Sequence, residues 1–131
     1  MTDQKILDAF QTMWGPFPEP VMLIHKDRTI LAVNNLARTT GCAPGIKCFS
    51  LNPEARTTTC KGCKANLALR EHRTVCTDTS QGGKRIIGYW MPLEAAPDVY
   101  VHFGVGIAEA MGVQPYPTIR EAEKDLVNLA H

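Results

Sequence analysis

Long apolar runs and a dominant sign of charge are both missing from the sequence. No stretch approaches the roughly 18 consecutive apolar residues that a membrane-spanning helix needs. Lys and Arg together number 14 against 13 Asp and Glu, so the strongly basic surface of many nucleic-acid-binding proteins is not expected. We therefore expect neither a membrane nor nucleic acid among the partners of this chain.

An export signal and a disulfide framework are missing as well. Residues 1–5 include an acid and lead into no apolar core with a small-residue cleavage site, which a secretory signal requires. A cytoplasmic location is the expectation that follows, and structural disulfides are rare in that reducing compartment. The count of five cysteines is odd in any case, so the cysteines need another explanation.

What is present is the composition of one compact domain. The chain has 131 residues, of which 44% are hydrophobic, and this suffices for one core but leaves no room for a second. Apolar residues recur at helical spacing near both ends, which predicts amphipathic helices over residues 3–14 and 118–131. Capping asparagines and strong helix formers predict two short internal helices, at 36–40 and 64–71.

Five β-strands are predicted between the terminal helices. Short apolar or β-branched runs, separated by turn residues, indicate them. They span residues 21–25, 29–33, 74–79, 85–91 and 99–107. The last three strands are joined by short turns and cannot be parallel, so the expected fold class is α+β with an antiparallel sheet.

The order of these elements resembles that of a PAS domain, the sensor module of two-component and transcriptional regulators, over residues 16–108. The resemblance is carried by Pro20-Val21-Met22-Leu23-Ile24 before a charged turn, Ile30-Leu31-Ala32-Val33-Asn34-Asn35-Leu36-Ala37, Gly41, Ala68-Leu69-Arg70-Glu71-His72-Arg73-Thr74-Val75, and the Gly82-Gly83 hairpin before Tyr89-Trp90-Met91-Pro92. It implies a five-stranded antiparallel sheet with helices on one face. Residues 1–15 would be an added N-terminal helix, and residues 109–131 a linker and a C-terminal helix.

The resemblance also implies a sensory or signalling module that is not an enzyme. The sequence contains no catalytic triad, phosphate-binding loop, paired-carboxylate site or HExxH motif. In a PAS-like domain a small ligand or cofactor would lie between the helices and the sheet, and its change would be passed to a partner. The apolar stripes of the terminal helices must be buried against something, so we expect a homodimer or a signalling partner.

Large side chains on the helix-facing side of the sheet, and on the helices, are expected to line that ligand cavity. Side chains alternate between the two faces of a strand, so Tyr89 and Met91 should lie on the face opposite Trp90. The candidate pocket residues are Ile24, Phe49, Leu67, Trp90 and Phe103.

Four of the five cysteines fall between residues 42 and 63 and form a candidate metal site. Cys60-Lys61-Gly62-Cys63 has the CxxC spacing that lets two thiolates reach one metal from a single turn. Four thiolates are the ligand count of a tetrahedral zinc site or an iron-sulfur cluster. The predicted ligands are Cys42, Cys48, Cys60 and Cys63, with zinc or an iron-sulfur cluster as the cofactor.

The cysteine pattern is similar to that of some PAS domains from anaerobic or facultative bacteria. In that group a cysteine precedes a CxxC pair in the helical region, and some members hold an oxygen-labile cluster. The matching positions in this chain are Cys48, Cys60 and Cys63. The fourth ligand would be Cys42, Cys76 or His72.

Two other interpretations of the cysteines stay open. Buried cysteines are often inert and pack as small apolar residues. Alternatively, Cys60 and Cys63 form a dithiol that switches reversibly to a disulfide, favoured by the positive charges of Lys61 and Lys64, which stabilise a thiolate. A dithiol redox protein is therefore the alternative function.

Overall fold

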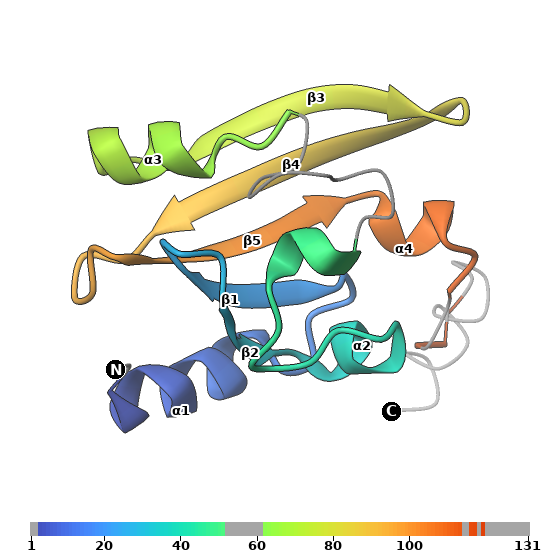
Figure 1. Cartoon of the computed structure of the whole chain (residues 1–131). Helices are drawn as coiled ribbons and strands as arrows, with labels where there is room; N and C mark the ends of the chain where they lie inside the picture. Colours follow the sequence, from blue (N-terminus) through green and yellow to red (C-terminus); the bar gives the residue numbers. More distant parts are fainter. Residues whose placement is uncertain (1–2, 52–61, 114–115, 118, 120–131) are drawn as a thin grey trace, which may run out of the picture.

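The computed structural model describes residues 3–51, 62–113, 116–117 and 119 of the chain (Figure 1). Its elements are α1 (Gln4–Trp14), β1 (Val21–His25), β2 (Ile30–Val33), α2 (Asn35–Thr39), the 3-10 helix η1 (Cys48–Leu51), α3 (Ala65–Glu71), β3 (Val75–Gln81), β4 (Lys84–Pro92), β5 (Val99–Val105) and α4 (Ile107–Ala110). Among the helices of these residues, none has the length and apolar content needed to cross a bilayer.

Five strands form one antiparallel sheet in the order β2-β1-β5-β4-β3, so β5 lies at its centre. β1 and β2 form a hairpin, while β3, β4 and β5 follow one another as an antiparallel meander. The hairpin and the meander belong to one sheet because β1 also pairs with β5, with Leu23 opposite Val101. The predicted α+β class and the five-stranded antiparallel sheet are confirmed.

Alternation along the strands gives the sheet two apolar faces, which different helices cover. On one face, α2 and α3 pack against the sheet. We call this face the helix-side core, and it consists of Ile24, Ile30, Val33, Ala37, Ala65, Ala68, Val75, Trp90 and Tyr100. On the other face α1 packs, and this α1-side core consists of Phe10, Val21, Leu23, Val99 and Val101. The short helices therefore share one face, as predicted, and the N-terminal helix occupies the other.

The N-terminal helix begins and ends where its residues predict. Asp3 is its N-cap, and its side chain accepts a hydrogen bond from the amide of Lys5 at 2.9 Å. The apolar stripe of α1 packs against the α1-side core through Phe10, which is 4% exposed. The predicted C-terminal helix over residues 118–131 lies, apart from residue 119, outside the described residues.

The central strand is shorter than predicted, because a helix begins directly after it. β5 ends at Val105 rather than at residue 107, since Gly106 adopts a left-handed conformation with φ of 103° and α4 follows. The carboxylate of Glu19 accepts hydrogen bonds from the amides of Gly106 and Ala108, both at 2.8 Å. The segment that leads into β1 is thereby tied to the end of β5.

Asn34 joins the start of the sheet to the N-terminal segment, and it is fully buried. Its side-chain oxygen accepts hydrogen bonds from the amides of Val21 and Ala37 at 2.9 and 3.0 Å, the second as the N-cap of α2. Its side-chain amide donates to three backbone carbonyls between α1 and β1. These belong to Trp14, Phe17 and Glu19, at 3.2, 3.2 and 2.8 Å. One side chain thus satisfies backbone groups from three segments.

We expect Asn34→Ala to lower the free energy of unfolding by about 2–4 kcal/mol, because it removes a helix cap and leaves several buried backbone groups without partners. The measurement is a urea titration of both proteins. The matched control is Asn35→Ala, which removes an exposed side chain at the next position and should cost much less. Equal losses in the two variants would contradict this role of Asn34.

Candidate functional site

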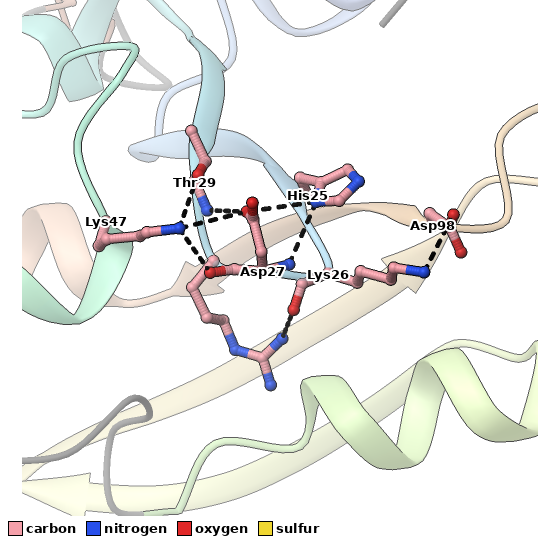
Figure 2. Close-up of polar contacts among 7 residues, drawn as sticks. His25, Lys26, Asp27, Thr29, Lys47 and Asp98 are labelled. Carbon is pink, nitrogen blue, oxygen red and sulfur yellow. Dashed lines mark hydrogen bonds and ion pairs between the residues drawn. The ribbon is translucent and has the colours of Figure 1, made fainter. Parts of the chain in front are cut away.

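The turn between β1 and β2 is organised around the carboxylate of Asp27 (Figure 2). Its Oδ1 accepts a hydrogen bond from the amide of Thr29 at 2.8 Å and lies 3.2 Å from Nδ1 of His25. Nζ of Lys47 is 3.6 Å from the same oxygen. These contacts, led by the Thr29 amide, hold the pKa of Asp27 well below its ordinary value. The carboxylate is therefore ionised at neutral pH and holds the turn together.

The same turn fixes the position of Cys48. Lys47 donates hydrogen bonds to the carbonyl of Asp27 at 3.0 Å and to the hydroxyl of Thr29 at 2.9 Å (Figure 2). The amide of Cys48 donates to the carbonyl of Arg28 at 2.9 Å. The chain from residue 45 to 48 therefore runs along the turn and the start of β2, and η1 begins at Cys48 itself.

The side chain of Arg28 points into the protein, although the residue lies in the turn between β1 and β2. Its φ of 76° is left-handed and uncommon for a residue with a side chain, and only 5% of its surface is exposed. Nη1 donates to the carbonyl of Lys26 at 2.7 Å, and Nη2 donates to Oδ1 of Asn66 in α3 at 2.8 Å. The guanidinium carbon lies 5.8 Å from the centre of the Tyr100 ring. The charged group therefore lies between the sheet and α3.

The guanidinium charge has no full counter-charge in the part of the chain that the structure describes. No ion pair there involves Arg28, and its Nε is buried without a hydrogen-bond partner. An arginine stays protonated inside a protein, so the buried group keeps its charge. A buried cation held by neutral groups alone is energetically costly, and this position is therefore a candidate site for negative charge.

Tyr100 links Arg28 to two cysteines. Its side chain is 1% exposed, and burial is the main cause that raises the pKa of its hydroxyl above the ordinary value. Charge at Cys48 and Cys63 and a hydrogen bond with Cys48 act in the same direction, while the charge of Arg28 acts against them. The hydroxyl is therefore neutral, and it lies within interaction range of both thiols and of the guanidinium.

Three of the four predicted metal ligands reach this face, while Cys60 lies outside the described residues. Cys42, Cys48 and Cys63 are half-buried and pack against the helix-side core. The sulfur of Cys42 is 3.8 Å from Oγ1 of Thr40, and burial raises the pKa of this thiol. Within the described ranges, no three His, Cys, Asp or Glu side chains are grouped closely enough to hold a metal ion. The four-cysteine site stays a prediction that depends on Cys60.

The two other candidate ligands do not join this face. Cys76 is exposed on β3, and its neighbour Val75 belongs to the helix-side core. Because successive side chains of a strand alternate, Cys76 lies on the opposite face. His72 is exposed and left-handed, with φ of 53°, at the end of α3. Of the three candidates for the fourth ligand, Cys42 is the one that packs against the helix-side core.

Most of the predicted pocket residues lie on the helix side, where they pack as core. Ile24 and Trp90 are 0% and 6% exposed, and Leu67 packs against them. Phe49 is half-buried in η1. A cavity of about 300 Å³ lies instead on the other face, between α1 and the sheet.

The expectation that Phe103 lies on the helix side is wrong. Its ring packs on the α1 side, 5.2 Å from the ring of Trp14 and 5.4 Å from that of Phe17. The physical reason is the pleat of β5, where Phe103 lies three positions after Tyr100, an odd step that puts the two side chains on opposite faces. Tyr100 therefore occupies the position that was assigned to Phe103.

A neutral histidine lies beside Trp90 on the helix side. The ring of His102 stacks on that of Trp90, with 4.7 Å between the centres, and its Nδ1 lies 2.8 Å from the carbonyl of Tyr89. Burial lowers the pKa of His102 below its ordinary value, against the opposing effect of that hydrogen bond. The imidazole is therefore uncharged at neutral pH, and it provides no cation or counter-charge to the site.

Sequence reasoning did not identify Arg28, Asn66 and Tyr100 as site residues. Arg28 stands in a charged turn, where solvent exposure is the ordinary expectation, and its positive φ has no sequence signal. For Tyr100 a signal existed in the strand periodicity, because it shares a face with His102, the register partner of Trp90. The contact between Arg28 and Asn66 joins residues far apart in the chain, and it is visible only in the fold.

Comparison with known proteins bears on the fold. No family model and no curated protein matches the sequence. The structure is similar to that of a sensory box sensor histidine kinase from Vibrio cholerae, with a TM-score of 0.56 and 13% identity, over 79% of this chain and 91% of that chain.

Two further solved structures are similar at lower TM-scores. One is a domain of an HTR-like protein from Haloarcula marismortui, with a TM-score of 0.49 and 15% identity over 66% of this chain and 93% of that chain. The other is the PAS domain of BvgS from Bordetella pertussis, with a TM-score of 0.42 and 16% identity over 98% of this chain and 97% of that chain.

The chain has the PAS fold. The five-stranded antiparallel sheet with short helices across one face agrees with the pattern that the sequence predicts, and the sensory box structure shares this architecture. At 13% identity the likeness concerns the fold alone.

Asp27→Asn should destabilise the protein at neutral pH, and by progressively less as the pH falls below about 4, the ordinary pKa of an aspartate. The pKa of Asp27 is depressed in the folded state, so its ionised form stabilises the turn above the unfolded-state pKa. That contribution is lost as acid protonates the carboxylate. The measurement is the difference in unfolding midpoint between the two proteins from about pH 7 to about pH 2.

Asp98→Asn is the control for this titration. It removes one exposed ion pair, in which Lys26 lies 3.4 Å from the carboxylate, and leaves the Asp27 contacts in place (Figure 2). Its effect should be small at every pH. A stability difference for Asp27→Asn that does not vary with pH would contradict the role of the ionised carboxylate.

Proposed function

We propose that this chain is a non-enzymatic sensory module, whose input is a metal or iron-sulfur centre held by cysteine thiolates, and which signals through a homodimer or a partner protein. One observation carries the proposal. Cys42, Cys48 and Cys63 come from three separate segments and pack against one core, on the face that the short helices cover. The exposed Cys76, by contrast, lies on the other face.

The donor set on the helix side suits zinc or an iron-sulfur cluster, because both are bound by thiolates. Cys48 and Cys63 both interact with the hydroxyl region of Tyr100. Cys60 precedes Cys63 at the CxxC spacing and would complete this group, with Cys42 as the fourth ligand. A centre of this kind, when bound, would supply sensitivity to metal, oxygen or redox state.

An orphaned polar atom on the same side of the sheet supports the same proposal, since the guanidinium of Arg28 lies over Tyr100 of the helix-side core. Nε of Arg28 is buried and has no partner among the described residues. Every thiolate adds a negative charge, so a thiolate centre is a suitable neighbour for this group.

The fold offers a route from the centre to the ends of the domain. Tyr100 lies on β5, the central strand, and the end of β5 is tied to the segment before β1 through Glu19. A displacement of β5 would therefore act on both segments that leave the sheet. On the opposite face, α1 exposes 73% of Met13, which would contribute apolar surface to a second copy or a partner.

The direct test is the metal content, acid-labile sulfide and visible spectrum of protein purified without oxygen. An iron-sulfur centre would give a coloured protein with iron and sulfide, whereas zinc would give a colourless protein with stoichiometric metal. Cys48→Ser and Cys63→Ser should lose most of the metal, because each removes a thiolate ligand. Cys76→Ser should keep it, and it is the matched control on the opposite face.

Colourless and metal-free wild-type protein would contradict the thiolate centre. Mass spectrometry of the denatured sample would then show whether an organic ligand had been bound instead. Titration of thiols before and after mild oxidation would test the dithiol alternative, which requires a reversible disulfide between Cys60 and Cys63.

A further inference from the structure

The short helix after the central strand is capped by a residue from the other end of the domain. α4 follows directly on β5 (Figure 1), and its N-cap is Gly106, which has no side chain to accept from the first free amides of the helix. The carboxylate of Glu19, 87 residues earlier in the chain, takes this role. Its Oε2 accepts from the amide of Gly106 and its Oε1 from that of Ala108, both at 2.8 Å. Hydrogen bonds from helix amides to a carboxylate are among the stronger ones in proteins.

α4 has little else to hold it in place. Besides Glu19, the described residues attach it through two apolar side chains and one exposed ion pair. Ala108 is 7% exposed, and Ile107 lies directly over Gly104 of β5, where an added Cβ would be 2.8 Å from Cγ1 of Ile107. A helix of four residues is not stable by itself, so the docking of α4 depends on these few contacts.

Glu19 is held in turn by the linker between α1 and β1. Pro18 and Pro20 on either side have a fixed φ, and a residue before a proline is restricted to extended conformations. The carbonyl of Glu19 accepts from the side-chain amide of Asn34 at 2.8 Å. The carboxylate therefore reaches α4 because this stiff linker keeps its path beside the start of the sheet.

The residue between β5 and α4 is suited to a hinge. Gly106 has a left-handed φ of 103°, and a Cβ at this position would lie 2.5 Å from the carbonyl oxygen of Arg85 on β4. The docked conformation therefore requires glycine, and glycine also gives the chain other conformations when the helix is released. The junction combines a hinge with a cap from a distant segment.

We infer that Glu19 is a latch that couples the two segments outside the sheet. α4 stays docked while the linker before β1 keeps its place, and undocking of α4 and release of the linker occur together. The inference goes beyond the proposed function and does not depend on what the helix side binds. A purely local role, in which Glu19 satisfies two amides and nothing more, predicts that the linker and α4 loosen independently.

Amide hydrogen exchange of the full chain, followed by NMR, measures the docking of α4. The reporters are the amides of Ala110 and Met111, which donate to the carbonyls of Gly106 and Ile107 within the helix at 3.0 and 2.9 Å. Glu19→Gln should accelerate their exchange by about 10- to 100-fold, the effect of losing a hydrogen bond to a charged group. The amides of β4, a strand inside the sheet, report global unfolding and should change much less.

The converse variant tests the coupling. Ile107→Ala removes the apolar contact with Gly104 and loosens α4 without changing Glu19. The amide of Phe17, which donates to the carbonyl of Trp14 at 3.0 Å, reports on the linker. It should exchange at least about 5-fold faster in Ile107→Ala, the lower end of ordinary coupling between two sites. In a Glu19→Gln background the same change should have a much smaller effect on Phe17, because the connection is already weakened.

Glu109→Gln is the matched control, because it makes the same chemical change on α4 itself. It removes an ion pair with Lys84 at 3.2 Å whose two side chains are exposed. The exchange of Met111 should change by less than about 5-fold, since exposed pairs contribute little. Glu19→Asp keeps the charge but shortens the reach, and it is the second variant should Glu19→Gln not fold.

The outcomes separate a latch from a local cap and from general stability. Faster exchange in α4 for Glu19→Gln, together with faster exchange of Phe17 for Ile107→Ala, supports the inference. Unchanged exchange in α4, equal acceleration in α4 and β4, or a Phe17 amide that does not respond to Ile107→Ala overturns it. The metal content of the protein enters none of these outcomes, so the proposed function stands or falls separately.

Discussion

The inward orientation of Arg28 is the constraint on which the candidate site depends. A left-handed residue in the β1–β2 turn directs a permanent charge between the sheet and α3, where it lies over Tyr100 and binds Asn66. The ionised Asp27 and its bonds to Lys47 hold that turn in the required form. Because the segment from 45 to 48 is bound to the same turn, the placement of Cys48 follows from it. The polar contacts of this turn therefore fix the positions of both Arg28 and Cys48.

The two faces of the sheet carry different groups of side chains. The helix side carries three cysteines and the buried charge, while the α1 side carries an aromatic cluster and an apolar cavity beneath a helix. β5 belongs to both faces, since Tyr100 lies on one and Phe103 on the other. Glu19 ties the end of this strand to the segment that enters the sheet. A displacement of β5 caused on the helix side would therefore reach the segment before β1 and the segment after β5, which Glu19 joins.

Local patterns predicted most of the fold, whereas contacts between distant segments were out of their reach. Apolar alternation and turn residues indicated all five strands, and Asn34 indicated the cap of α2. The end of β5 was misplaced because it depends on Glu19, more than eighty residues earlier in the chain. Phe103 was assigned to the wrong face because the side on which a strand residue lies follows from sheet register. The inward turn of Arg28 depends on a backbone conformation that composition does not specify.

A thiolate-held centre on the helix side is the central claim, and X-ray absorption at the metal edge of anaerobically purified protein tests it most directly. Near stoichiometric metal, surrounded mainly by sulfur at about 2.3 Å, is the predicted result. The method sees every ligand of the metal, including Cys60, without a need to know its position in advance. Metal bound by nitrogen and oxygen alone, or no metal above background, would contradict the account.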